Sequence, residues 1–60
     1  MQITDKDIAR LKKYGIQIDL INRKIIYKRE VIYAMSLNNL NRIVGLILDL
    51  LDLLEGKPED

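Results

Sequence analysis

Hydrophobic and polar positions along the chain predict two helices on either side of a β-hairpin. Near the N-terminus, Thr4 suits a helix N-cap, and Asp7 follows three residues later at the spacing of a capping box. Gly15 suits the left-handed position after a helix, because glycine adopts positive φ without a steric penalty. We therefore predict a first helix over residues 5–14, with its apolar positions, such as Leu11, turned inward.

A pattern with a period of two follows this helix. Ile16, Ile18 and Leu20 alternate with polar residues, which is typical of a half-buried strand. Residues 25–33 are rich in β-branched side chains and Tyr and contain neither Gly nor Pro, so they predict one continuous second strand. Residues 22–23, Asn followed by Arg, supply the turn, since Asn tolerates positive φ.

The apolar side chains also predict the register of the hairpin. A loop with an even number of residues sets Leu20 opposite Ile25 and Ile18 opposite Tyr27, which gathers apolar side chains on one face. The polar side chains that we expect on the opposite, outer face include Gln17, Lys24 and Lys28.

A long second helix is predicted over residues 36–55. Ser36 suits its N-cap, Met35 and Leu40 have the spacing of a hydrophobic staple, and Gly56 suits its C-terminal end. The chain is thus expected to be an α+β protein, with a short N-terminal helix, a β-hairpin and a long C-terminal amphipathic helix.

The surface of the second helix predicts self-association. Its eleven large aliphatic residues cover an arc of about 220°, whereas a helix packed on one neighbour needs a stripe only a little over about 100° wide. Within this arc, six positions follow the spacing of a coiled-coil seam. We predict a homodimer or higher oligomer in which the interface consists of Leu37, Leu40, Val44, Ile47, Leu51 and Leu54. The alternative is that all eleven residues fill the core of one chain.

Composition narrows the function. A chain of 60 residues forms one small domain, expected over residues 1–56 with a frayed tail over 57–60. Absence of Cys and His excludes disulfides, thiol and imidazole catalysis and the commonest metal ligands, so we expect no enzyme, no metal and no cofactor. The N-terminus lacks a signal-peptide pattern and the longest apolar stretch is too short and too charged to cross a bilayer, so we expect a cytoplasmic protein without a membrane partner.

The net charge of +1 is unevenly distributed. Residues 1–29 hold eight basic and three acidic residues, a sum of +5, and residues 30–60 hold two basic and six acidic residues, a sum of −4. Such a division suits an anionic partner, or else two halves that complement each other within or between subunits. Three acids in the last turns of the second helix, Asp49, Asp52 and Glu55, oppose the helix dipole, so a basic group is expected close to them.

Nucleic acid is the anionic partner that this pattern favours. A two-stranded ribbon fits the major groove, and basic residues on the first helix would contact phosphates. The predicted nucleic-acid contacts are Arg10, Lys12, Lys13, Gln17, Arg23, Lys24 and Lys28. The expected function is therefore that of a small homo-oligomeric DNA- or RNA-binding protein in regulation or replication. The alternative is a protein-interaction module that uses the ribbon edge or the apolar helix face and binds another protein instead of nucleic acid.

Overall fold

A computed structural model describes residues 2–56 of the chain. The predicted tail over residues 57–60 lies outside the described residues. Along the chain the elements are α1 (Asp5–Lys13), β1 (Ile16–Asp19), β2 (Lys24–Tyr27), β3 (Glu30–Tyr33) and α2 (Leu37–Glu55). The predicted α+β class and both helices are confirmed.

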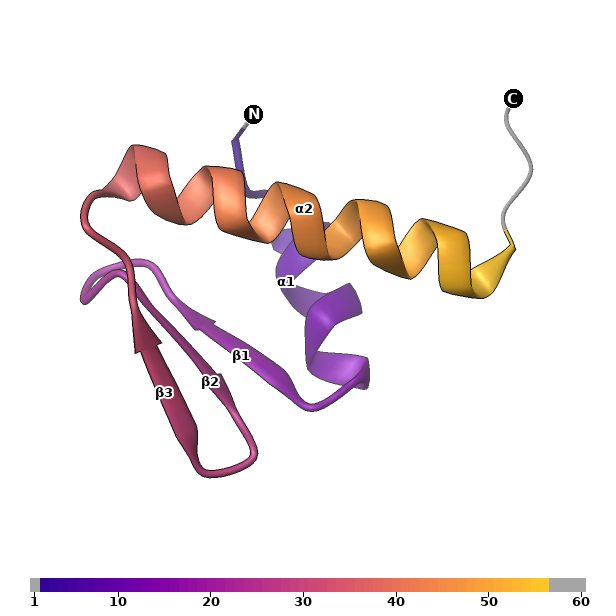
Figure 1. Ribbon diagram of the computed structural model, residues 1–60, viewed down its shortest axis with the longest axis horizontal. Helices are drawn as coiled ribbons and strands as arrows, with labels where there is room; N and C mark the ends of the chain where they lie inside the picture. The colour runs from indigo at the N-terminus through magenta and orange to yellow at the C-terminus, as the bar shows by residue number, and fades with distance from the viewer. Residues whose placement is uncertain (1, 57–60) are drawn as a thin grey trace.

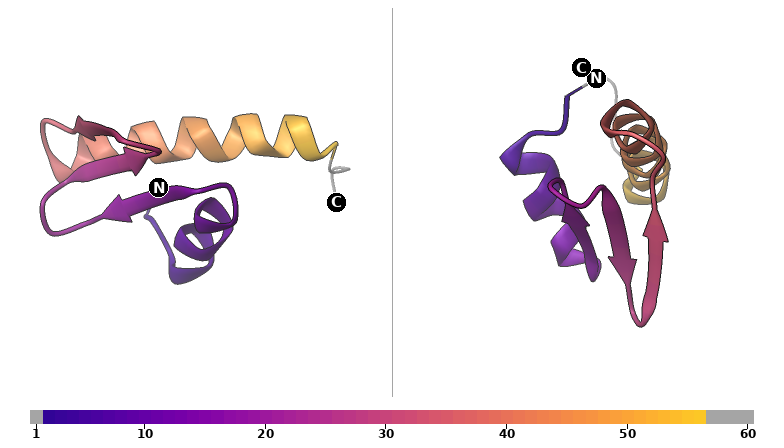
Figure 2. Two further views of the ribbon diagram at one scale, coloured as in Figure 1. Left: turned by 90° about the horizontal axis from the view of Figure 1, so that it is seen from below. Right: turned by 90° about the vertical axis from the view of Figure 1, so that its left-hand side faces the viewer.

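The three strands form one antiparallel sheet in the order β1-β2-β3, and α1 packs beside β1. The long helix α2 runs across the molecule, with α1 and the sheet on the same side of it (Figures 1 and 2). This arrangement leaves much of the circumference of α2 without another element against it (Figure 2). Within residues 2–56, no helix is long and apolar enough to cross a membrane.

Local hydrogen bonds begin α1 as the sequence predicts. The Thr4 N–H donates to the Asp7 carboxylate at 3.0 Å, and the Asp7 N–H donates to the Thr4 hydroxyl at 3.2 Å, so the capping box is complete. The helix ends one residue earlier than predicted, since Tyr14 is its C-cap. Gly15 follows with a φ of 80°, the left-handed conformation expected of it.

The ends of α2 are also as predicted, with one exception. The Asn39 N–H donates to the Ser36 hydroxyl at 3.0 Å, and Gly56 ends the helix with a φ of 62°. The staple between Met35 and Leu40 is wrong: Leu40 is completely buried, whereas Met35 is 91% exposed. The Met35 N–H instead donates to the Asn39 side-chain oxygen at 3.1 Å, which satisfies this end of the helix without an apolar contact.

Strands β1 and β2 confirm the predicted faces but correct the predicted register. In β3 the faces are the reverse of those predicted, since Tyr27 pairs with Glu30 and Ile26 pairs with Val31. Ile16 pairs with Tyr27 and Ile18 pairs with Ile25, so Ile18 lies two residues away from its predicted partner. A shift of two residues preserves the face on which each side chain of β1 and β2 lies, because strand side chains alternate with a period of two. Ile25 is consequently buried, and Leu20 lies in the loop instead of the sheet.

A hydrogen-bonded loop explains the shift. The Asp19 carboxylate accepts bonds from the Asn22 side chain at 2.9 Å and from the Asn22 backbone N–H at 3.0 Å, which closes the loop around residues 20–23. These two bonds, the side-chain one foremost, hold the pKa of the Asp19 carboxyl below its usual value. Arg23, rather than Asn22, takes the positive φ of 54°.

The prediction of one strand over residues 25–33 is wrong, because the chain turns at Lys28 and Arg29. Tyr27 pairs with Glu30 across this two-residue loop, and Lys28 has a φ of 56°. Two-residue hairpin loops require positive φ, for which Gly, Asn and Asp are the usual residues. None of them occurs here, so the turn has no conventional signal. The one available signal is the run of three charged residues over 28–30 in the middle of an apolar segment.

The core lies where α1 and the inner face of the sheet meet α2. Its buried side chains are Leu11 from α1, Ile25 from β2, and Leu40, Val44, Leu48 and Leu51 from α2. Partly buried residues that include Ile16, Ile18, Ile43 and Ile47 pack around it. No polar side chain within the described part of the chain is buried.

The backbone at Lys28 gives a prediction about stability. A side chain at positive φ costs about 1–2 kcal/mol, so Lys28→Gly should raise the free energy of unfolding by about 0.5–1 kcal/mol after the entropy cost of glycine. Urea denaturation measures this as a higher midpoint with an unchanged slope. Lys28→Ala removes the same charge but keeps the Cβ, so it should give no such gain. An equal gain from both variants would contradict backbone strain as the cause.

Candidate functional site

Four cations gather at one end of the molecule, which we call the basic end. Lys12 and Lys13 occupy the last turn of α1, and Lys28 and Arg29 form the turn between β2 and β3. The pairing of Ile16 with Tyr27 sets the start of β1 beside this turn, so α1 finishes at the same end of the sheet. All four cations are exposed, and among residues 2–56 no ion pair is recorded for any of them.

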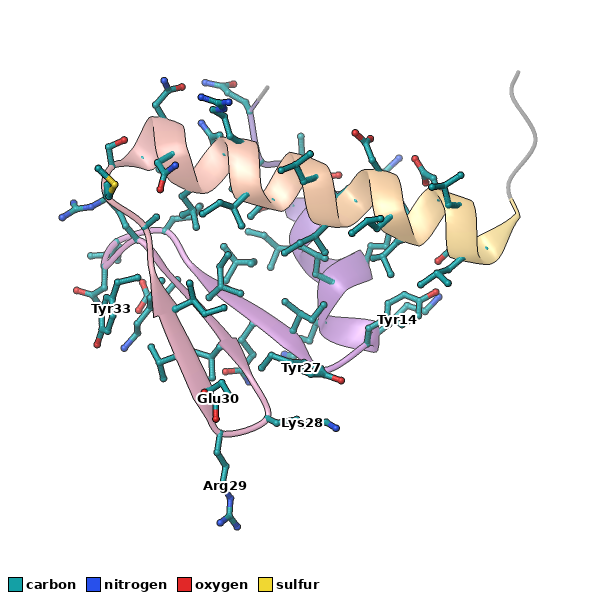
Figure 3. The ribbon with its side chains drawn as sticks, in the orientation of Figure 1. Tyr14, Tyr27, Lys28, Arg29, Glu30 and Tyr33 are labelled. Carbon is teal, nitrogen blue, oxygen red and sulfur yellow. The ribbon has the colours of Figure 1, made fainter. Side chains whose placement is uncertain are left out.

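The turn projects two of these cations into solvent. Figure 3 shows Lys28 and Arg29 pointing away from the body of the protein, on the side remote from α2. The Lys28 ammonium lies 5.4 Å from the centre of the Tyr27 ring, within cation–π range. Tyr27 is 43% exposed, so an aromatic surface accompanies the positive charge. Arg29 was not among the predicted contacts, because one continuous strand was expected over residues 25–33.

The other predicted contacts lie elsewhere on the sheet. Gln17 is exposed on the outer face, and Lys24 is half-buried there beside Asp19 and Tyr33 of the flanking strands. Arg23 lies in the loop at the far end of β2, roughly 16 Å along the strand from the turn that contains Lys28. The prediction that Lys28 lies on the outer strand face with Lys24 is therefore wrong.

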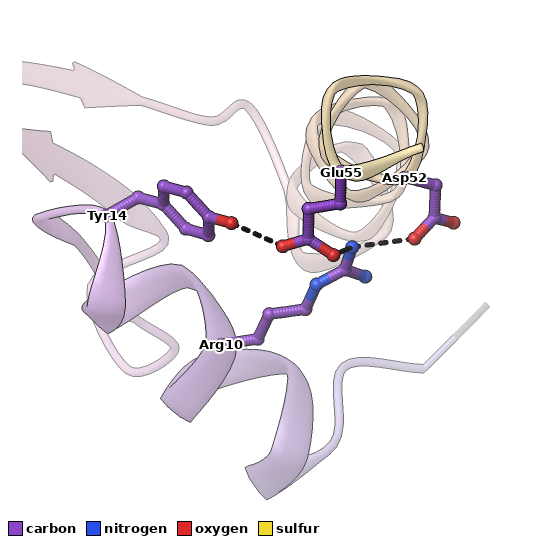
Figure 4. A network of polar contacts seen from close by, with 4 residues as sticks. All are labelled: Arg10, Tyr14, Asp52 and Glu55. Carbon is purple, nitrogen blue, oxygen red and sulfur yellow. Dashed lines mark hydrogen bonds and ion pairs between the residues drawn. The ribbon is translucent and has the colours of Figure 1, made fainter. Parts of the chain in front are cut away.

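Arg10 binds carboxylates of its own chain. Its Nη2 atom lies 2.6 Å from Asp52 Oδ1 and 2.8 Å from Glu55 Oε1, and the Tyr14 hydroxyl donates to the other oxygen of Glu55 (Figure 4). Arg10 and Tyr14 come from α1 and its C-cap, and both acids come from the last turns of α2. The network thus joins α1 and its C-cap to the last turns of α2.

The network compensates the negative charges of Asp52 and Glu55 at the C-terminal end of α2. Their charges oppose the helix dipole, and Arg10 provides the basic group that was expected close to them. The two side-chain bonds raise the pKa of Arg10. The bond to Glu55 is the main cause that raises the pKa of Tyr14. Arg10, from the basic half of the chain, thus pairs with acids of the acidic half. Arg10 is therefore not available to contact phosphate as predicted.

The structure divides the predicted helix seam into two groups. Leu40, Val44 and Leu51 are buried in the core of the same chain, and Ile47 is partly buried against it. Leu37 and Leu54, at the two ends of the helix, are exposed. An interface between two copies of the chain through these six residues therefore stays a prediction.

The other features of α2 within the described residues are a hollow beside Gly45 and the absence of a metal-binding group. Within the described residues, no group of three or more acidic, His or Cys side chains is placed to hold a metal ion. Gly45 borders a hollow of about 330 Å³ on the polar side of the helix. The lining residues of this hollow are Asn38, Asn41, Arg42, Gly45, Leu46 and Asp49.

Comparison with known proteins gives no identification: no family model, no curated protein and no solved structure matches the chain. The charges, the exposed side chains and the free edge of the sheet are therefore the features that bear on function.

The network around Glu55 makes a prediction about pH. Folding raises the pKa of Tyr14 above 10.0. The bond to Glu55 therefore stabilises the folded protein at a pH below the pKa that Tyr14 has in the unfolded chain. This stabilisation is lost as the pH rises through the pKa that Tyr14 has in the folded protein. Titration of phenolate absorbance should show one tyrosine that ionises late, and this late step should disappear in Tyr14→Phe and move to lower pH in Glu55→Gln. Asp5→Asn, at the opposite end of α1, serves as the control and should leave the step unchanged. An unchanged late step in Glu55→Gln would contradict the assignment.

Proposed function

We propose that this protein binds nucleic acid through the basic end, with single strands preferred over duplex. The observation that carries the proposal is the convergence of Lys12, Lys13, Lys28 and Arg29, from two separate parts of the sequence, on one exposed end. Phosphate contacts supply the sequence-independent part of nucleic-acid affinity, and exposed Lys and Arg without carboxylate partners are suited to make them.

The exposed ring of Tyr27 at the basic end favours binding of single strands over duplex. Bases without a pairing partner stack on exposed aromatic side chains, and each such contact contributes about 1–3 kcal/mol in single-strand binding proteins. Tyr27 directly precedes the basic turn, and the Lys28 ammonium lies within cation–π range of its ring. In our proposal the cations hold the phosphates and Tyr27 stacks on a neighbouring base.

The outer face of the sheet argues against reading of base edges in the major groove. Base recognition there uses polar side chains on a helix or a two-stranded ribbon. The sheet has three strands, and its outer face carries the apolar Ile26 and Val31 together with Tyr33 beside its few polar side chains. We therefore propose binding with little dependence on sequence, by a protein that acts in the cytoplasm without catalytic activity.

The test is titration of the full chain with labelled single-stranded DNA, single-stranded RNA and duplex DNA over a series of salt concentrations. We expect binding to single strands whose affinity falls with salt, and Lys28→Gln or Lys12→Gln should each lower the salt slope by about one. Lys6→Gln, which removes one charge from the first turn of α1, is the matched control and should leave the slope unchanged. Tyr27→Leu should weaken single-strand binding by about fivefold to a hundredfold with the slope unchanged.

Three outcomes would contradict the proposal. They are no binding at tens of micromolar in low salt, a signal that vanishes by physiological salt, and an equal loss from Lys6→Gln and Lys28→Gln. The last two would indicate only the general attraction of any basic surface for nucleic acid.

The free edge of β3 favours the second candidate, a protein-interaction module. The Ala34 N–H donates to the Arg23 carbonyl at 2.8 Å, so the alternation of an antiparallel ladder leaves the backbone groups of Val31 and Tyr33 at the outer edge. Both side chains are exposed, and no proline blocks the strand. An added strand from another protein would use these groups, and this alternative follows if nucleic acid does not bind.

A further inference from the structure

The helix α2 carries a second apolar stripe, distinct from the one in the core. The outer stripe consists of Ile43, Leu46, Leu50 and Leu53, spaced by three, four and three residues as in a coiled-coil seam. Ile43, at its N-terminal end, is partly buried against the core, and the three leucines lie outside the core. At about 100° per residue the stripe is centred roughly 130° around the helix from the buried side chains. Its three leucines are 65%, 59% and 78% exposed.

Exposed leucines in such a row require a partner. Three consecutive seam positions in water form an apolar surface of the kind that marks an interaction site. None of α1, β1, β2 or β3 covers them, since each leucine stays more than half exposed in the folded chain.

Charges beside the stripe point to a second copy of the chain. Arg42 and Asp49 lie on the same flank of the outer stripe, seven residues and about 10 Å apart along the helix, too far to pair with each other. No ion pair is recorded for either residue within residues 2–56. A surface that carries one positive and one negative group at a fixed spacing is complementary to itself after a twofold rotation.

An antiparallel arrangement satisfies this complementarity. When two α2 helices cross antiparallel near Gly45, Arg42 of each helix lies beside Asp49 of the other, which gives two ion pairs. Ile43 and Leu46 of both helices meet in the centre. The hollow at Gly45, which Asp49 also lines, leaves room for the long arginine side chain. Flanking charges of this kind set the orientation and register of paired helices.

Other ways of packing two outer stripes together do not pair Arg42 with Asp49. In a parallel pair, the flank with Arg42 and Asp49 faces the opposite flank, which carries the apolar Ile47 and Leu54. An antiparallel pair displaced so that Leu46 faces Leu50 brings the two Asp49 carboxylates together. The parallel pair thus leaves Arg42 and Asp49 unpaired, and the displaced antiparallel pair makes the two Asp49 carboxylates repel each other.

We infer that the chain forms a symmetric dimer in which the outer stripes of two α2 helices pack antiparallel, held in register by reciprocal ion pairs between Arg42 and Asp49. This interface differs from the seam predicted from sequence, of which three residues are already buried in the core. It does not depend on nucleic acid, so its test and that of the proposed function are separate.

A charge exchange tests the inference. Sedimentation equilibrium without nucleic acid should give a mass twice the 7.0 kDa of the chain at micromolar concentration. Arg42→Asp and Asp49→Arg each place like charges at both contacts and should weaken dimerisation by about tenfold or more. The double variant R42D/D49R restores opposite charges and should return the dissociation constant to within about threefold of the original.

Two further variants separate dimer loss from unfolding. Leu46→Asp should abolish the dimer with the helical circular dichroism retained, because this side chain lies outside the core. Ile21→Asp, at an 87% exposed apolar residue in the β1–β2 loop, is the matched control and should leave the dimer intact. A monomer at tens of micromolar, or a double variant as weak as the single ones, would overturn the inference.

Discussion

The structure depends on the contact that four residues of α2 make with the rest of the chain. Leu40, Val44, Leu48 and Leu51 meet Leu11 from α1 and Ile25 from β2, and these are the buried apolar side chains of the described residues. A core of this size in a chain of 60 residues contributes about 3–5 kcal/mol of net stability. The other elements must therefore be fixed mainly by local bonds, and the fold gains from any contact that covers more of α2.

Local bonds are indeed prominent. The capping box of α1, the Asp19–Asn22 loop and the Ser36 cap each satisfy backbone donors within three residues in sequence. Arg10 is the exception, since it spans more than forty residues to reach the acids of α2. Its bonds orient α1 against the second half of α2, where the core offers only Leu48 and Leu51. Partly exposed ion pairs contribute modestly to stability, but they fix an orientation that a few leucines alone would leave loosely defined.

Local chemistry also decides how much of this structure the sequence could predict. The helix ends were predictable because Thr4, Ser36 and Gly56 act through bonds or dihedral angles within a few residues. The faces of β1 and β2 were predictable for a similar reason, since alternation survives a shift of two residues. The turn at Lys28 was not predictable, because a lysine at positive φ is held there by the pairing of β3 with β2 and not by its own preference. The basic end and the inclusion of Arg29 in it depend on this turn.

The surface of α2 shows the other limit of sequence reasoning. An apolar arc of about 220° contains two seams with the same spacing, and helical periodicity alone cannot tell which one meets the core of the same chain. The tertiary contacts of Leu11 and Ile25 select one seam and leave the three leucines of the outer stripe exposed. The outer stripe belongs to α2, whereas the turn with Lys28 and Arg29 projects from the far end of the sheet (Figure 3). A dimer through α2 would therefore leave both basic ends open. Because the second of two linked sites binds at a raised effective concentration, such a dimer would hold a strand long enough to reach both ends more tightly than one copy does.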